Sequence, residues 1–186
     1  MNIIELTDSL ERCPVIPAIK DGGWASALSS PAEILFYLKA NIITLPTKIK
    51  EAHENGKKIF VHIDLAEGIG KDRTGIRFAK CADVDGIIST RSNLIKTASE
   101  MGLLTVQRFF IIDSHSVLTT TDALKNSKTD MIEVMPGVVP KVIRDLKEQI
   151  SLPIIAGGLI YDESDIKMAK NSGAAAVSTG ATEFWR

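Results

Sequence analysis

The sequence has 186 residues and a formal net charge of −1, with 45% hydrophobic and 24% charged residues. A chain of this length can bury a sizeable core, so we expect residues 1–186 to form one domain. The composition excludes an intrinsically disordered chain. The near-zero net charge excludes a general attraction to nucleic acid or to anionic membranes, so any contact with RNA must be a local patch.

The first residues contain no basic segment followed by a long apolar run, and no later apolar stretch reaches the ~18 to 20 residues of a membrane span. We therefore expect a cytoplasmic protein with no membrane partner. Cys13 and Cys81 are far apart and the three histidines are scattered. Since neither disulfide nor metal-ligand spacing is present, the sequence predicts no metal site and no cofactor.

Short apolar runs recur along the whole chain. They are rich in Ile and Val and apolar on both faces, as strands are when helices cover a parallel sheet. We predict eight strands, at Pro14–Lys20, Ile34–Leu38, Lys58–Asp64, Gly86–Arg91, Leu103–Arg108, Met131–Met135, Pro153–Gly157 and Ala174–Thr179.

Amphipathic stretches of helical period lie between these runs. Several of them end in a glycine, which takes the left-handed conformation at a helix C-terminus without strain. The pattern predicts helices at Leu45–Asn55, Lys71–Ala82, Ser92–Met101, Pro140–Ile150 and Glu163–Ser172.

Eight strand–helix units favour an α/β protein of the compact (β/α)8 TIM-type barrel class, although an open doubly wound sheet obeys the same local rules. The chain is shorter than the ~250 residues usual for this barrel. The span from Asp21 to Glu33 contains Gly22, Gly23 and Pro31, which leaves room only for a reduced first helix.

In (β/α)8 barrels the loops after the last two strands commonly bind phosphate. Strand seven ends in Gly157 and Gly158, and strand eight ends in Ser178, Thr179 and Gly180, followed by a helix start at Thr182. Glycines let backbone N–H groups approach an anion, and hydroxyls add donors. We therefore predict a phosphate site here. The alternative is that the glycines only form a turn and the hydroxyls only cap a helix.

Alternation along the strands predicts a polar mouth for the barrel, because His62 and Asp64 share a face with Phe60. Charged groups inside a barrel must be paired or face a wet cavity, so such a ring indicates either a ligand pocket or an internal hydrogen-bonded network. Arg91 is a candidate to pair with a ligand phosphate. The predicted polar ring consists of Lys20, His62, Asp64, Ser89, Gln107 and Glu133.

The segment from Asp64 to Asp72 is rich in glycine and charge and is typical of a functional loop. We expect Glu67, Lys71 and Asp72 to lie over the site. Its Gly-x-Gly-Lys does not have the spacing of a nucleotide-binding phosphate loop.

Long strings of the sequence resemble the glycerol-3-phosphate-responsive antiterminator family. They are VHIDLAEGIGKD (Val61–Asp72), DGIISTRSNLIKTA (Asp85–Ala98), GLLTVQRFFIIDS (Gly102–Ser114), IEVMPGVVPKVI (Ile132–Ile143), PIIAGGLI (Pro153–Ile160) and AAAVSTGATEFW (Ala174–Trp185). The resemblance extends from about Pro14 to the end of the chain.

This resemblance implies a bacterial transcription antitermination regulator of the glycerol uptake operon, which senses glycerol 3-phosphate and acts on leader mRNA. A phosphate site agrees with such an effector, or with a similar small phosphate ester. The RNA half of the function depends on the resemblance alone, because the basic residues are scattered and aromatics make up only 5%. The candidate RNA contacts are Lys48, Lys50, Lys57, Lys58, Lys141, Arg144 and Lys147. The sequence leaves open whether the protein forms a homo-oligomer.

The alternative is an enzyme acting on a small phosphorylated substrate, such as an isomerase or a transferase similar to prenyl-glyceryl-phosphate synthases. His62, Asp64 and Glu133 would then be the acid–base candidates. Two of these side chains converging on a reacting atom would favour an enzyme, and a long hydrophobic trough beside the pocket would favour the transferase.

Overall fold

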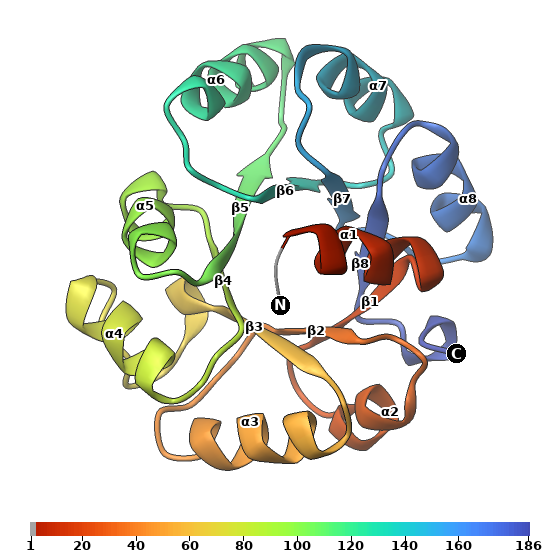
Figure 1. Ribbon diagram of the computed structural model, residues 1–186. Coiled ribbons are helices and arrows are strands. Elements are labelled where there is room, and N and C mark those ends of the chain that lie inside the picture. The colour runs from red at the N-terminus through yellow and green to blue at the C-terminus, as the bar shows by residue number, and fades with distance from the viewer. Residues whose placement is uncertain (1–2) are drawn as a thin grey trace.

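The computed structural model describes residues 3–186, in which eight parallel strands pair in sequence order and β8 closes onto β1 (Figure 1). The prediction of a (β/α)8 barrel is confirmed, and the open sheet is excluded. The strands are β1 (Val15–Ile19), β2 (Ile34–Tyr37), β3 (Lys58–His62), β4 (Gly86–Ser89), β5 (Leu104–Phe110), β6 (Met131–Met135), β7 (Ile154–Gly157) and β8 (Ala176–Thr179).

Helices surround the barrel and follow the strands in turn (Figure 1). The first crossover helix has six residues, as expected from its glycines and proline, and the element after β8 is a 3-10 turn, η2 (Thr182–Phe184). The crossover helices are α2 (Trp24–Ser29), α3 (Leu45–Glu54), α4 (Arg73–Cys81), α5 (Ser92–Glu100), α6 (Ser114–Lys125), α7 (Pro140–Gln149) and α8 (Glu163–Asn171), and a 3-10 turn, η1 (Ile63–Leu65), follows β3.

The barrel interior is filled by apolar side chains contributed by every strand. Phe36 and Phe60 lie 5.9 Å apart between ring centroids and are the largest of these side chains. Burial of this set supplies much of the hydrophobic stabilisation of the fold. The cluster consists of Ile16, Ile34, Phe36, Phe60, Ile88, Val106, Met131, Ile155 and Ala176.

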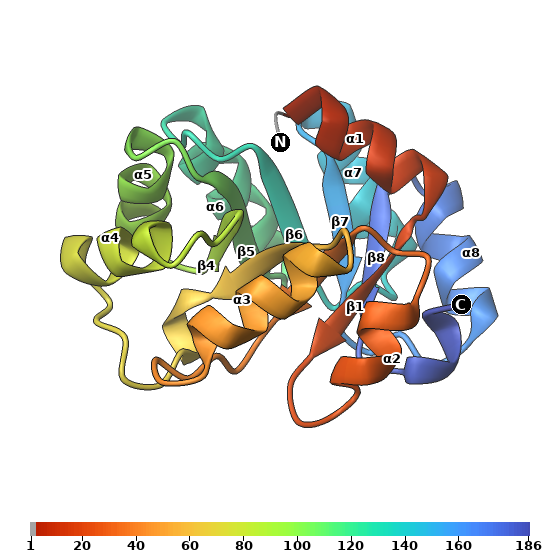
Figure 2. The same ribbon diagram turned by 60° about the horizontal axis from the view of Figure 1, so that its bottom comes forward.

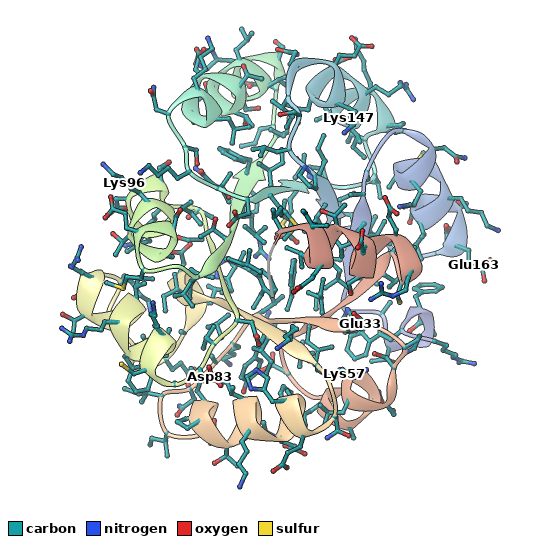
Figure 3. The ribbon with its side chains drawn as sticks, in the orientation of Figure 1. Glu33, Lys57, Asp83, Lys96, Lys147 and Glu163 are labelled. Carbon is teal, nitrogen blue, oxygen red and sulfur yellow. The ribbon has the colours of Figure 1, made fainter. Side chains whose placement is uncertain are left out.

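A helix that the sequence analysis did not predict, α1 (Ile3–Arg12), lies across the end of the barrel where the strands begin (Figures 1 and 2). Its Leu6 and Leu10, four residues apart on one face, pack into the interior cluster. Arg12 at its end donates to Glu33, just before β2, at 2.7 Å (Figure 3). The helix therefore closes this end of the barrel.

The outward faces of the strands pack against the crossover helices. Val61 and Ile87, for example, share a core cluster with Ile49 of α3, Ile76 of α4 and Leu94 of α5. Within residues 3–186, no helix is long and apolar enough to cross a membrane.

Candidate functional site

A cavity of about 340 Å³ lies at the carboxyl ends of the strands, opposite α1. This volume falls within the range of small-ligand sites. Its lining combines charged and hydroxyl groups with apolar side chains. The lining residues are Ala18, Lys20, Leu38, Arg108, Glu133, Met135, Gly158, Leu159, Ile160, Tyr161, Ser178, Thr179, Gly180 and Ala181.

Three buried side chains from β5, β6 and β8 form a hydrogen-bonded row at this cavity. Arg108 Nε donates to Glu133 Oε2 at 2.6 Å, and Ser178 Oγ donates to Glu133 Oε1 at 2.5 Å. Arg108 is 6% exposed and Glu133 is fully buried. Burying an ion pair costs several kcal/mol per ion in lost hydration, so these hydrogen bonds are needed to stabilise the buried pair.

Gly157 of β7 makes room for this row. A Cβ atom at position 157 would lie 2.5 Å from Glu133 Oε1 and 2.6 Å from Ser178 Oγ. Gly157, which was predicted to bind phosphate, does not line the cavity, and its lack of a side chain allows the Glu133 carboxylate and the Ser178 hydroxyl to meet.

His62 of β3 is 3% exposed and follows Phe60 on the inward face. Burial first, and then the nearby Arg108 charge, lower the pKa of His62 to about 4, so the ring is neutral at pH 7. Among the described residues, both ring nitrogens of His62 and the Nη2 atom of Arg108 are buried without a hydrogen-bond partner. Buried polar atoms are normally satisfied, and of these two residues only Arg108 lines the cavity.

Arg108 is the residue that the sequence analysis missed. Gln107 was predicted to point inward, but Val106 belongs to the interior cluster and Arg108 pairs with the inward Glu133. The prediction for Gln107 is therefore wrong. Its side chain instead accepts from Ser127 and donates to Ser92, behind the strand.

Ser89 is also misplaced in the predicted ring, because Ile88 is the inward residue of β4. Ser89 Oγ donates to the Asp64 carboxylate at 2.9 Å, and the backbone N–H of Thr90 donates to it at 2.7 Å. Arg91 lies 3.6 Å from the same carboxylate, is 54% exposed, and does not line the cavity. Asp64 thus fixes the loop after β4 rather than facing the cavity.

The loop after β3 is braced internally and does not line the cavity. Lys71 Nζ donates to the carbonyl oxygens of Ala66 and Ile69, and Asp72 caps α4 by accepting from Gly75 N–H at 2.9 Å. Glu67 accepts from Asn41 after β2. The prediction that these residues lie over the site therefore has no support in this arrangement.

The ends of β7 and β8 do line the cavity, through Gly158, Ser178, Thr179 and Gly180. Gly158 has φ +74°, a conformation that favours glycine. Thr179 Oγ1 accepts from the Ala181 N–H at 3.1 Å. The helix start expected at Thr182 is only a 3-10 turn, so helix-dipole support for an anion is weak there.

Fold and site together define a (β/α)8 barrel protein with a candidate ligand cavity at the end where such barrels carry their function. The glycerol-3-phosphate responsive antiterminator family matches residues 15–185. The chain belongs to this family, as its sequence strings predicted.

Individual relatives agree with this assignment. The chain is 38% identical over 178 residues to the YgcP protein of Escherichia coli K12, which covers 95% of this chain and 93% of YgcP. Its fold is similar to the crystal structure of the glycerol uptake operon antiterminator regulatory protein of Listeria monocytogenes, with a TM-score of 0.85 and 31% identity over 93% of this chain and 95% of that one. A glycerol uptake operon antiterminator-related protein of Thermotoga maritima gives a TM-score of 0.81 and 30% identity over 92% and 96%.

Proposed function

We propose that this protein is a bacterial cytoplasmic regulator that binds glycerol 3-phosphate in the cavity and acts on leader mRNA of a glycerol uptake operon. The observation that carries the effector half is the buried, unpartnered Nη2 atom of Arg108 in the lining of a cavity that Lys20, Gly158 and Gly180 also line. Family membership and the similarity to the glycerol uptake operon antiterminator regulatory protein of Listeria monocytogenes support the RNA half.

The chemistry of the cavity suggests how the effector lies. Its phosphate oxygens would accept hydrogen bonds from the backbone N–H groups and hydroxyls at the ends of β7 and β8, close to Lys20. Its glycerol hydroxyls would face the Glu133 carboxylate, which accepts, and the unpartnered Nη2 atom of Arg108, which donates.

A thermal-shift titration with glycerol 3-phosphate, glycerol 1-phosphate, glycerol and inorganic phosphate tests the effector half. Ligand at ~100 times its dissociation constant stabilises the fold by about 2.7 kcal/mol. In a chain of this size that gain raises the melting temperature by roughly 5 to 11 °C. We expect glycerol 3-phosphate to give the largest shift, and the absence of a shift with all four compounds would refute the effector assignment.

Two lysine variants localise the binding. Lys20→Ala removes an exposed cation that lines the cavity, and Lys96→Ala removes one on the outer face of α5 (Figure 3). We expect Lys20→Ala to weaken binding by about 1 to 2 kcal/mol and Lys96→Ala to leave it unchanged. Equal affinities in both variants would place the phosphate elsewhere.

Transcription in vitro through a glycerol-operon leader tests the RNA half. We expect readthrough of the terminator to rise only when protein and glycerol 3-phosphate are both present, because the effector must favour the RNA-binding state. If glycerol 3-phosphate binds the protein but does not change readthrough, the proposed action on RNA is refuted and the proposed effector binding is retained.

An enzyme acting on a phosphorylated substrate is the second candidate, and the apolar groove beside the cavity described below favours a transferase. The acid–base groups argue against it, since the Asp64 and Glu133 carboxylates are engaged by Ser89, Thr90, Arg108 and Ser178. Following glycerol phosphates, with and without a prenyl diphosphate, by ³¹P NMR tests this alternative. New phosphorus signals that require the protein would establish a reaction.

A further inference from the structure

A second hollow, of about 380 Å³, adjoins the polar cavity. The two share the walls formed by Met135, Gly158 and Leu159. In contrast to the polar cavity, with its Lys20, Arg108 and Glu133, this hollow has no charged residue in its lining. We call it the apolar groove, and its lining residues are Phe110, Ile111, Ile112, Met135, Pro136, Gly158 and Leu159.

Three large apolar side chains of the groove are exposed to solvent. Phe110 is 57% exposed, Ile112 is 89% exposed and Leu159 is 51% exposed. Exposed apolar side chains that gather around a hollow mark a binding surface more often than isolated ones do. Phe110 is the last residue of β5, Ile112 lies in the loop after it, and Leu159 lies in the loop after β7.

The backbone around the groove is fixed before any ligand arrives. The Gly137 N–H donates to the Gly157 carbonyl at 2.6 Å, and the Ile111 N–H donates to the Met135 carbonyl at 2.7 Å. Leu159 has φ +59°, a left-handed conformation that is unfavourable for leucine. Such strain is concentrated at binding and catalytic sites, where the surroundings hold it in place.

We propose that the site also binds a second class of ligand, an amphipathic phosphate ester, whose phosphate end occupies the polar cavity in place of glycerol 3-phosphate and whose apolar substituent lies in the groove. This inference rests on the proposed function, because it takes the polar cavity as the phosphate subsite. Glycerol 3-phosphate has no apolar substituent that could occupy the groove. The unbroken wall of Met135, Gly158 and Leu159 favours one ligand that spans both hollows over a separate partner on the groove.

Calorimetric titration with methyl, butyl, hexyl and octyl phosphate tests this proposal, with glycerol 3-phosphate measured alongside. If the chain enters the groove, affinity rises with each buried methylene by up to about fourfold, the factor that corresponds to 0.8 kcal/mol. If glycerol 3-phosphate binds and the alkyl series is flat, the amphipathic ligand is refuted while the proposed function stands. If neither glycerol 3-phosphate nor any alkyl phosphate binds, both fail.

Two leucine variants assign the effect to the groove. Leu159→Asn removes the apolar wall, and asparagine tolerates the left-handed backbone. Leu118→Asn removes a leucine of similar exposure on α6 that does not line the groove. We expect Leu159→Asn to flatten the dependence of affinity on alkyl chain length, and Leu118→Asn to keep the full dependence. A dependence unchanged in both variants would refute the groove as the subsite.

Sedimentation velocity of the same proteins distinguishes the other occupant, a second copy of this chain. We expect the wild-type protein and Leu159→Asn to sediment alike. Self-association that Leu159→Asn abolishes, together with a flat alkyl series, would assign the groove to an interface between copies and overturn the ligand proposal.

Discussion

The carboxylate of Glu133 is fully buried and accepts hydrogen bonds from Arg108 and Ser178, which compensate for its lost hydration. Arg108→Met would leave that charge unpaired, and we expect the free energy of unfolding to fall by about 3 to 5 kcal/mol. Arg108→Met combined with Glu133→Leu should recover most of this loss, because no buried charge remains. Urea denaturation of the three proteins measures both effects, and a single variant as stable as the wild type would contradict this account.

His62 makes the stability of the barrel depend on pH. Its pKa is about 4 in the folded protein and about 6.5 in an unfolded chain, so the unfolded state binds the proton first as pH falls. The contribution of neutral His62 is complete above pH 6.5 and is lost progressively down to about pH 4. It amounts to about 3 kcal/mol.

The variant His62→Gln isolates this dependence. It cannot take up a proton, so its loss of stability between pH 6.5 and pH 4 should be about 3 kcal/mol smaller than that of the wild-type protein. Chemical denaturation at several pH values measures the difference. Parallel curves for the two proteins would mean that His62 is protonated equally in both states.

At the level of single residues, the sequence indicated part of the site. The alternation of side chains along β3 placed His62 inward correctly, because the large apolar Phe60 two residues earlier defines the inward face. The same reasoning placed Glu133 of β6 inward. It failed for β5, which extends to Phe110, because polar side chains lie on both faces of this strand, Gln107 on one and Arg108 on the other. The phase of the strand depends on its pairing with β4 and β6. Arg108 could be recognised only once that phase was known.

Helix α1 closes the end of the barrel where the strands begin. Leu10 is 1% exposed and packs into the interior cluster, so Leu10→Ala leaves a cavity at the closed end. We expect the free energy of unfolding to fall by about 2 to 5 kcal/mol. The matched control is Leu118→Ala, which removes an exposed leucine and should change stability by less than about 0.5 kcal/mol. Equal effects in thermal or urea denaturation would show that α1 is not docked.

Among the elements, the strands and most crossover helices were predictable within one or two residues, because the hydrophobic period switches between them. The helix α1 was not predicted, since it precedes the first strand and belongs to no strand–helix repeat, although Leu6 and Leu10 have helical spacing. The helix expected at Thr182 was also wrong, because only a 3-10 turn forms before Trp185 packs against Ile19, Ala27 and Leu35.

For the whole molecule, a net charge of −1 limits how RNA can be held. Lys57 is buried and donates to the Ser30 and Ala32 carbonyls, and Lys58 pairs with Asp85. Lys48 and Lys50 of α3 pair with Glu51 and Glu54 of the same helix. The exposed cations Lys141, Arg144 and Lys147 on α7 remain as candidate phosphate contacts.

Three such contacts predict a shallow salt dependence of RNA affinity, with a slope of about −2 in log K against log salt for single-stranded RNA. The variant Lys147→Ala should make that slope shallower by about 0.7, whereas Lys96→Ala should not change it. Fluorescence anisotropy with a leader RNA at several salt concentrations measures both slopes. A slope several times steeper would place the RNA on another surface.

Closure of β8 onto β1 also determines how this protein can meet other macromolecules. Every strand of the barrel has a neighbour on both sides, so no row of unpaired main-chain N–H and C=O groups is open for a peptide to join as an extra strand. The same closure removes the template on which strand-mediated aggregates begin. Any partner must therefore be recognised through loops and side chains, which can diverge among relatives while the barrel stays the same.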